Sequence, residues 1–283
     1  MADENWTLLK VLRWTQTRFS ERGLPAARLD AEVLLSHVLG MDRIALYTHF
    51  DQPLAKEELA RYRELIRRRL AGEPVAYLVS RQEFWSIPLY VDERVLIPRP
   101  ETEILVEVVL AFLKGKAQPR VLDVGTGSGA IAIAIAHERP DAEVLAVDVS
   151  PGALEVAKRN AEAADAEVEF LAGDLFAPAS ARGPFTAIAS NPPYIEDGAF
   201  AALQREVQRE PRGALLGGPD GLAVIRRLVA GAPPLLEEGG MLAMELGAGQ
   251  AQAVARLLGA RGFREVAVKR DLAGIERIVS GLK

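Results

Sequence analysis

The chain has 283 residues, a formal net charge of −5 and no cysteine. This length accommodates one large domain with a smaller one, and the lack of cysteine excludes disulfides, thiolate catalysis and cysteine-ligated zinc. No uncharged apolar stretch approaches the ~20 residues that cross a bilayer, and the acidic start resembles neither a secretory signal nor a basic transit peptide. The composition therefore predicts a cytoplasmic protein with no membrane partner.

The charge is unevenly distributed along the chain. Residues 1–75 carry 12 basic and 11 acidic side chains, so the remainder has a net charge of −6. An enzyme that acts on nucleic acid usually has a concentrated positive field over its cleft. The acidic remainder argues against direct contact with nucleic acid.

The first 75 residues are predicted to form a helical domain. Apolar side chains recur at helical spacing over residues 6–19 and 59–70, and an apolar segment over 29–39 ends at Gly40, a favourable C-terminal stop. A run of arginines is expected to face solvent on the last helix, with a partner-binding patch as the alternative: Arg61, Arg63, Arg67, Arg68 and Arg69.

Residues 76–98 are predicted to form a β-hairpin linker. Two apolar segments, 84–91 and 95–97, are typical of short strands, and Asp92 and Glu93 between them would form the turn.

From residue 99 to residue 283, apolar strands alternate with amphipathic helices. This alternation indicates a mostly parallel sheet with helices on both faces. Helices are expected over 130–136, 152–164 and 250–260. Seven strands are expected, of which the last two would form an antiparallel hairpin at the sheet edge: 121–124, 144–149, 168–172, 186–190, 241–246, 265–269 and 277–279.

The first of these strands runs into a glycine-rich turn. Glycines allow a sharp bend and a close approach of a ligand to the backbone, and ligands of parallel sheets lie beyond the carboxyl ends of the strands. A dinucleotide fingerprint needs Gly-x-Gly-x-x-Gly, whereas here the third glycine comes one residue early. The spacing resembles motif I of class I methyltransferases, and the candidate cofactor residues are Gly125, Thr126, Gly127, Ser128 and Gly129.

Two acidic residues end the next two strands. Asp148 comes 21 residues after Gly127, where a carboxylate can accept hydrogen bonds from both ribose hydroxyls of a nucleoside. Asp174 falls where the methyltransferase pattern contacts adenine, and Leu175 and Phe176 after it are the two candidates for packing on the ring. A helix N-cap or a turn is the structural alternative for either aspartate.

A rigid polar turn follows the fourth strand. The two prolines of Asn191-Pro192-Pro193-Tyr194 fix the backbone and remove two N–H donors. The Asn191 oxygen and the Pro192 carbonyl can then accept hydrogen bonds from the two N–H groups of a planar –NH₂ group, against which Tyr194 offers a flat face. A turn that merely ends a strand would explain any one of these residues, but not the four in succession after a methyltransferase-like core.

Asn-Pro-Pro-Tyr is shared by methyltransferases that act on planar nitrogens, namely adenine N6 in DNA and the glutamine amide in proteins. With four further segments, the whole chain resembles the HemK-type (PrmC) peptide chain release factor N5-glutamine methyltransferase family: 72–78, 83–85, 91–103 and 270–274. Segment 100–103, Pro-Glu-Thr-Glu, favours this family over the branch that methylates a ribosomal-protein glutamine. A favourable helix start is the structural alternative for that segment.

The resemblance implies a class I (Rossmann-like) fold and S-adenosylmethionine as methyl donor, with S-adenosylhomocysteine as product. It implies that the substrate is the glutamine of the Gly-Gly-Gln motif in class 1 release factors, which the helices of residues 1–75 would recognise. Asn191 and Pro192 would be the catalytic residues, because they orient the amide nitrogen for in-line attack on the sulfonium methyl. Orientation of this kind contributes ~7–11 kcal/mol at best. Pro193 and Tyr194 would bind the substrate with them, and Asn191 would also contact the cofactor.

Other functions stay open at this point. A ribosomal-protein glutamine methyltransferase or an adenine-N6 methyltransferase would share the glycine-rich turn and the Asn-Pro-Pro-Tyr motif. A nicotinamide-dependent oxidoreductase would need different glycine spacing. A non-catalytic adaptor would keep the fold. The three histidines, at 37, 49 and 137, are expected to be structural, and no cluster has metal-ligand spacing. We expect a monomer with no metal and no general base.

Overall fold

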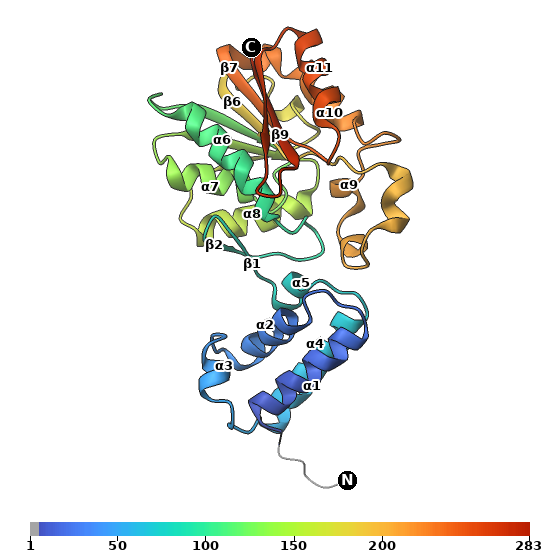
Figure 1. Cartoon of the computed structure of the whole chain (residues 1–283). Coiled ribbons are helices and arrows are strands. Elements are labelled where there is room, and N and C mark those ends of the chain that lie inside the picture. Colours follow the sequence, from blue (N-terminus) through green and yellow to red (C-terminus); the bar gives the residue numbers. More distant parts are fainter. Residues whose placement is uncertain (1–5) are drawn as a thin grey trace. The chain divides into compact units, whose positions relative to one another are not determined.

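The computed structural model describes residues 6–283 (Figure 1). The chain forms two compact units, one containing the segment up to Ser80 together with 204–209, and the other containing 81–203 and 210–283. The predicted division into 1–75, 76–98 and 99–283 assigns functions to segments and stays a prediction.

The first unit is helical, and a shared apolar core explains why its helices form. Leu8, Phe19, Leu34, Leu35 and Tyr62 are among its fully buried side chains. Gly40 ends the second helix with φ 64°, a left-handed conformation that glycine adopts without strain, so the predicted stop is confirmed. The helices are α1 (Leu8–Glu21), α2 (Ala27–Leu39), α3 (Ala45–Thr48), α4 (Lys56–Leu70) and α5 (Val75–Val79).

Arg69 departs from the arginine run that was expected to face solvent. Its side chain is only 4% exposed, and its guanidinium contacts Asp30 at 2.8 Å and Glu206 at 2.6 Å. A buried arginine needs carboxylate partners, and one of them comes from a segment far away in the sequence. The expectation was therefore wrong for this residue.

The second unit is built on a seven-stranded sheet in the order β5-β4-β3-β6-β7-β9-β8. The five strands from β5 to β7 are parallel, and β8 and β9 form the predicted antiparallel hairpin at the edge. The strands are β3 (Arg120–Val124), β4 (Glu143–Asp148), β5 (Glu169–Ala172), β6 (Phe185–Ser190), β7 (Leu236–Glu245), β8 (Arg264–Arg270) and β9 (Glu276–Leu282).

Helices cover both faces of this sheet, as predicted. Successive strand residues point to opposite faces: Val121 belongs to a core cluster with Leu105 and Ile133, whereas Leu122 belongs to one with Ile225 and Val254. The helices are α6 (Glu103–Leu113), α7 (Ala130–Glu138), α8 (Pro151–Ala163), α9 (Arg212–Leu215), α10 (Ala223–Gly231) and α11 (Ala251–Arg261). Short 3-10 helices are η1 (Pro100–Thr102), η2 (Ala177–Ala179), η3 (Asp197–Ala202), η4 (Val207–Arg209) and η5 (Pro233–Leu235). Among residues 6–283, no helix is long and apolar enough to span a membrane.

A hairpin lies within residues 76–98, but its two strands and its turn differ from the predicted ones, and residues 95–97 form no strand. Strands β1 (Gln82–Phe84) and β2 (Ile87–Leu89) are antiparallel, and Trp85 and Ser86 form the turn with φ 55° and 58°. Turns of this kind usually contain Asn or Gly, so the residues Trp85 and Ser86 did not indicate a turn in the sequence. The backbone N–H of Trp85 donates to Glu103 at 2.8 Å. The predicted turn at Asp92 and Glu93 was wrong.

Candidate active site

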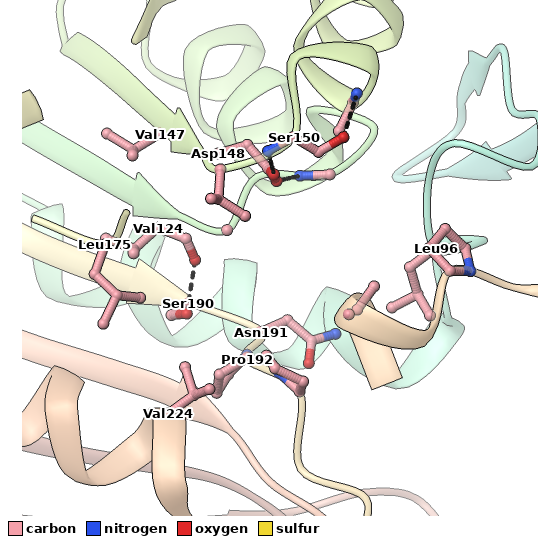
Figure 2. A pocket seen from close by; sticks show the side chains of 18 of the residues that line it. Leu96, Val124, Val147, Asp148, Ser150, Leu175, Ser190, Asn191, Pro192 and Val224 are labelled. Carbon is pink, nitrogen blue, oxygen red and sulfur yellow. Dashed lines mark hydrogen bonds between the residues drawn. The ribbon is translucent and has the colours of Figure 1, made fainter. Parts of the chain in front are cut away.

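A cavity of about 260 Å³ opens at the carboxyl ends of the central parallel strands (Figure 2). Gly125, Asp148, Asp174 and Asn191 come from the ends of β3, β4, β5 and β6 and all line it. The chain order reverses between β3 and β6, which is where open α/β sheets bind their ligands. These four predicted site residues therefore line one cavity at this edge of the sheet, and their binding roles stay a prediction.

The glycine turn after β3 leaves room for a ligand. Gly125 and Gly127 have φ of 76° and 56°, and a Cβ atom added to either would meet no protein atom within 4 Å. Both glycines line the cavity, so the space that a side chain would fill is available to a ligand. Gly129 has a different role, because a Cβ there would come within 2.9 Å of the Ile133 side chain.

Asp148 organises this turn from the end of β4. Its Oδ2 accepts a hydrogen bond from the Gly127 backbone N–H at 2.8 Å, and its Oδ1 accepts one from the Ser150 N–H at 2.8 Å. The N-cap of α8 is Ser150, whose hydroxyl accepts from the Ala153 N–H. Ser150 and not Asp148 is therefore the N-cap, whereas the bond from the Ser150 N–H to Asp148 is a turn contact of the kind that the other structural alternative named. The Asp148 side chain also lines the cavity.

The other residues of the glycine turn lie behind the cavity wall. Thr126, Ser128 and Gly129 are not among the residues that line it. The Thr126 hydroxyl donates to Asp123 at 2.6 Å, and burial raises the pKa of the Asp123 carboxyl to about 7. These contacts tie the turn to the strand that precedes it.

The segment after β5 separates the two candidates for an adenine contact. Leu175 lines the cavity, whereas Phe176 packs against α10, where a Cβ on Gly231 would come within 2.8 Å of its ring. Asp174 lines the cavity and pairs with Arg227. Of the two residues, Leu175 is therefore the one placed to touch a ligand.

The Asn-Pro-Pro turn lies across the cavity from Asp148 in Figure 2. Asn191, Pro192 and Pro193 line the cavity, and the Ser190 hydroxyl fixes their start by donating to the Val124 carbonyl at 2.7 Å. The Asn191 amide nitrogen donates to the Thr102 hydroxyl at 3.1 Å. Within residues 6–283, no hydrogen bond satisfies the Asn191 Oδ1 or the Pro192 carbonyl oxygen. The turn thus presents two unused acceptors.

Tyr194 is placed differently from its neighbours in the turn. It does not line the cavity, and its hydroxyl donates to Glu245 at 3.4 Å while its backbone carbonyl accepts from Gln250 at 2.9 Å. Burial raises the pKa of its phenol well above the usual value. Its predicted role as a flat face for the substrate stays a prediction.

Two buried residues outside the predicted site residues contact the turn; Thr102 entered the sequence analysis only as part of segment 100–103, and Glu245 was not singled out. Thr102, in the 3-10 helix before α6, and Glu245, at the end of β7, form a 2.5 Å hydrogen bond and are 4% and 1% exposed. Burial raises the pKa of the Glu245 carboxyl to about 7. An acidic residue at the carboxyl end of an apolar strand was the available signal for Glu245. Further cavity-lining residues outside the prediction include Arg94, Leu96, Val149 and Val224.

A glycine supports the turn from behind. A Cβ on Gly217 would lie 2.5 Å from the Pro193 carbonyl oxygen and 2.5 Å from that of Gly221. We expect Gly217→Ala to lower the free energy of unfolding by about 1–3 kcal/mol, measured by urea denaturation. Gly259→Ala in α11 is the control, because a Cβ there would meet no atom within 4 Å. Equal stability of the two variants would contradict the close packing at Gly217.

Two family models match the chain, the PrmC N-terminal domain over residues 10–79 and the methyltransferase small domain over residues 101–218. Release factor glutamine methyltransferase of Geobacter sulfurreducens is 46% identical, over 98% of this chain and 97% of its own length. The Bordetella pertussis enzyme of the same name is 48% identical, over 97% of this chain and 99% of its own. The chain belongs to the release factor glutamine methyltransferase family. The resemblance inferred from the motifs is confirmed.

Solved structures confirm the fold class. A methyltransferase from Pyrococcus furiosus superposes with a TM-score of 0.52 at 19% identity, over 77% of this chain and 96% of that one. The T. thermophilus 16S rRNA methyltransferase RsmC, in complex with AdoMet and guanosine, gives a TM-score of 0.55 at 20% identity, over 72% of this chain and 49% of that one. Likeness at this level of identity shows the class I methyltransferase-like fold alone.

Proposed function

We propose that this chain transfers a methyl group from S-adenosylmethionine to the side-chain amide nitrogen of a release factor glutamine, in the Gly-Gly-Gln motif that the family resemblance implies. The observation that carries the proposal is the pair of unused acceptors, Asn191 Oδ1 and the Pro192 carbonyl, in the same cavity as the glycine turn. Near-complete matches to release factor glutamine methyltransferases support the substrate.

The residues around the cavity fit S-adenosylmethionine. Gly125 and Gly127 leave open space for a ligand, and the Asp148 carboxylate oxygens each keep lone pairs for a ribose hydroxyl. Leu175 and the 70% exposed Val149 offer apolar surface for an adenine ring. When bound, this cofactor supplies a methyl group activated by a positively charged sulfur.

The chain's own contribution is orientation. An amide nitrogen is a poor nucleophile because its lone pair is delocalised into the carbonyl. Asn191 Oδ1 and the Pro192 carbonyl would each accept one N–H of the glutamine side chain, which aims the lone pair at the methyl group. The same two acceptors favour the positive charge that develops on the nitrogen.

The proposal assigns no general base. No histidine lies among the described residues that line the cavity, and an asparagine side chain does not take up a proton at neutral pH. The glutamine nitrogen therefore loses its extra proton to water once the nitrogen–carbon bond has formed.

The helical unit is proposed to recognise the protein substrate, with 76–98 as linker. We expect removal of residues 1–75 to lower methylation of a release factor by about 10²-fold or more, because remote binding energy positions the reacting group. Calorimetry should show unchanged affinity for S-adenosylhomocysteine, which also reports that the remaining chain is folded. Equal activity of the truncated enzyme would contradict a recognition role.

We also propose that the protein acts as a cytoplasmic monomer without direct contact with nucleic acid. The net charge of −6 on the chain after residue 75 supports the last point. To test this, the protein is incubated with labelled S-adenosylmethionine and, in parallel reactions, with a purified bacterial release factor, ribosomal proteins or DNA. Label on the release factor alone supports the proposal. Label on a ribosomal protein or on DNA instead would overturn it in favour of the corresponding alternative.

A further inference from the structure

A chain of three hydrogen bonds runs behind the Asn191 side chain. The Asn191 Nδ2 donates to the Thr102 hydroxyl at 3.1 Å, and that hydroxyl donates to Glu245 Oε2 at 2.5 Å. The other carboxylate oxygen of Glu245 accepts from the Tyr194 hydroxyl at 3.4 Å. Two members of the target turn, Asn191 and Tyr194, are therefore tied to one buried carboxylate.

The direction of these bonds follows from the donor inventory. A carboxylate only accepts hydrogen bonds, and a threonine hydroxyl has one hydrogen to give. Because Thr102 gives that hydrogen to Glu245, it can only accept from Asn191. The Asn191 amide must then turn its nitrogen toward Thr102 and its oxygen toward the cavity. A flipped amide would place the Asn191 oxygen against the Thr102 hydroxyl oxygen, so that lone pairs on both atoms would face each other.

We infer that Thr102 and Glu245 are positioning residues for methyl transfer, because they fix the orientation in which the Asn191 oxygen can receive the substrate amide. This inference rests on the proposed function. Neither residue lines the cavity, so both act through Asn191. With the amide reversed, Asn191 would present N–H donors to a substrate group that also carries N–H donors.

The groups around Glu245 determine how the hydrogen-bond chain from Asn191 through Thr102 to Glu245 responds to pH. Burial raises the pKa of Glu245, while Thr102 and the charge of Arg277 on β9 oppose the shift, and Glu101 adds to it. Asp271 pairs with Arg277 at 3.0 Å, and the Tyr194 phenol stays neutral because its own pKa is raised. A protonated Glu245 can donate to Thr102, which frees the hydroxyl hydrogen and permits the flipped amide. Lower pH should therefore weaken the orientation.

The first test replaces the hydroxyl and keeps the shape. We expect Thr102→Val to lower kcat for release factor methylation by about 10- to 100-fold, with unchanged affinity for S-adenosylhomocysteine. Thr102→Ser, which keeps the hydroxyl, should recover most of that loss. Thr186→Val is the matched control, since Thr186 is a buried threonine at the opposite end of β6 from Asn191. Equal activity of Thr102→Val and Thr102→Ser would overturn the inference.

The second test uses a readout that loss of stability would not move. The kcat/KM of the wild-type enzyme reports groups of the free enzyme, and it should fall below the pKa of Glu245 to a lower plateau, since the protonated form permits both amide orientations and only one of them is competent. Glu245→Gln cannot titrate, so this acid limb should disappear. Persistence of the same limb in Glu245→Gln would overturn the role of Glu245. A wild-type enzyme that never methylates a release factor would instead overturn the proposed function, and this inference with it.

Discussion

Asn191→Ala should reduce methylation of a release factor by about 10³-fold, because it removes one of the two acceptors that orient and stabilise the reacting amide. The side chain lines the cavity, and its oxygen makes no hydrogen bond within residues 6–283. Its loss therefore affects the substrate more than the fold. Initial rates with a purified release factor measure the effect.

A second variant at this position distinguishes the loss of the acceptor oxygen from the loss of the hydrogen bond to Thr102 that orients it. Asn191→Asp keeps an oxygen toward the cavity but cannot donate to Thr102, so it should fall between the wild-type enzyme and Asn191→Ala. All three proteins should bind S-adenosylhomocysteine with similar affinity in calorimetry. If Asn191→Ala kept more than a tenth of the wild-type rate, the turn would not orient the substrate.

Asp148→Ala should weaken the binding of S-adenosylhomocysteine by about 10²-fold or more, since hydrogen bonds to a charged group are worth about 1.5–3 kcal/mol each. The substitution removes the proposed ribose acceptor. It also leaves the Gly127 and Ser150 backbone N–H groups without their partner. Calorimetric titration measures the loss directly.

Asp174→Ala is the control for Asp148→Ala. Asp174 also lines the cavity, but it is more than half exposed and already paired with Arg227. Its removal should change the affinity by much less, because an exposed ion pair contributes little. A loss of less than about tenfold in Asp148→Ala would contradict the assignment of Asp148 to the ribose.

The central sheet could be predicted from the sequence because its strands are buried on both faces. Val121 and Leu122 contact opposite core clusters, so the strand is a continuous apolar run that stands out from the amphipathic helices. The glycine-rich turn and the acidic residues of the predicted site directly follow the ends of these strands. Parallel strands bring such ends together at one edge, and for this reason Gly125, Asp148 and Asn191 could be placed in one site.

Other features depend on contacts between residues far apart in the sequence. Trp85 occupies a turn that its backbone bond to Glu103 stabilises, and Arg69 is buried because Glu206 lies beside it. Thr102 and Glu245 are separated by 143 positions, and only the fold brings them within 2.5 Å. No local pattern reports a hydrogen bond of this kind.

The most direct test of the proposed activity is peptide mass spectrometry of a purified bacterial release factor, incubated with this protein and S-adenosylmethionine. We predict a gain of one CH₂, with fragment ions placing it on the side-chain nitrogen of the Gly-Gly-Gln glutamine. A methyl group on another residue, or no gain while the cofactor binds, would contradict the proposed function.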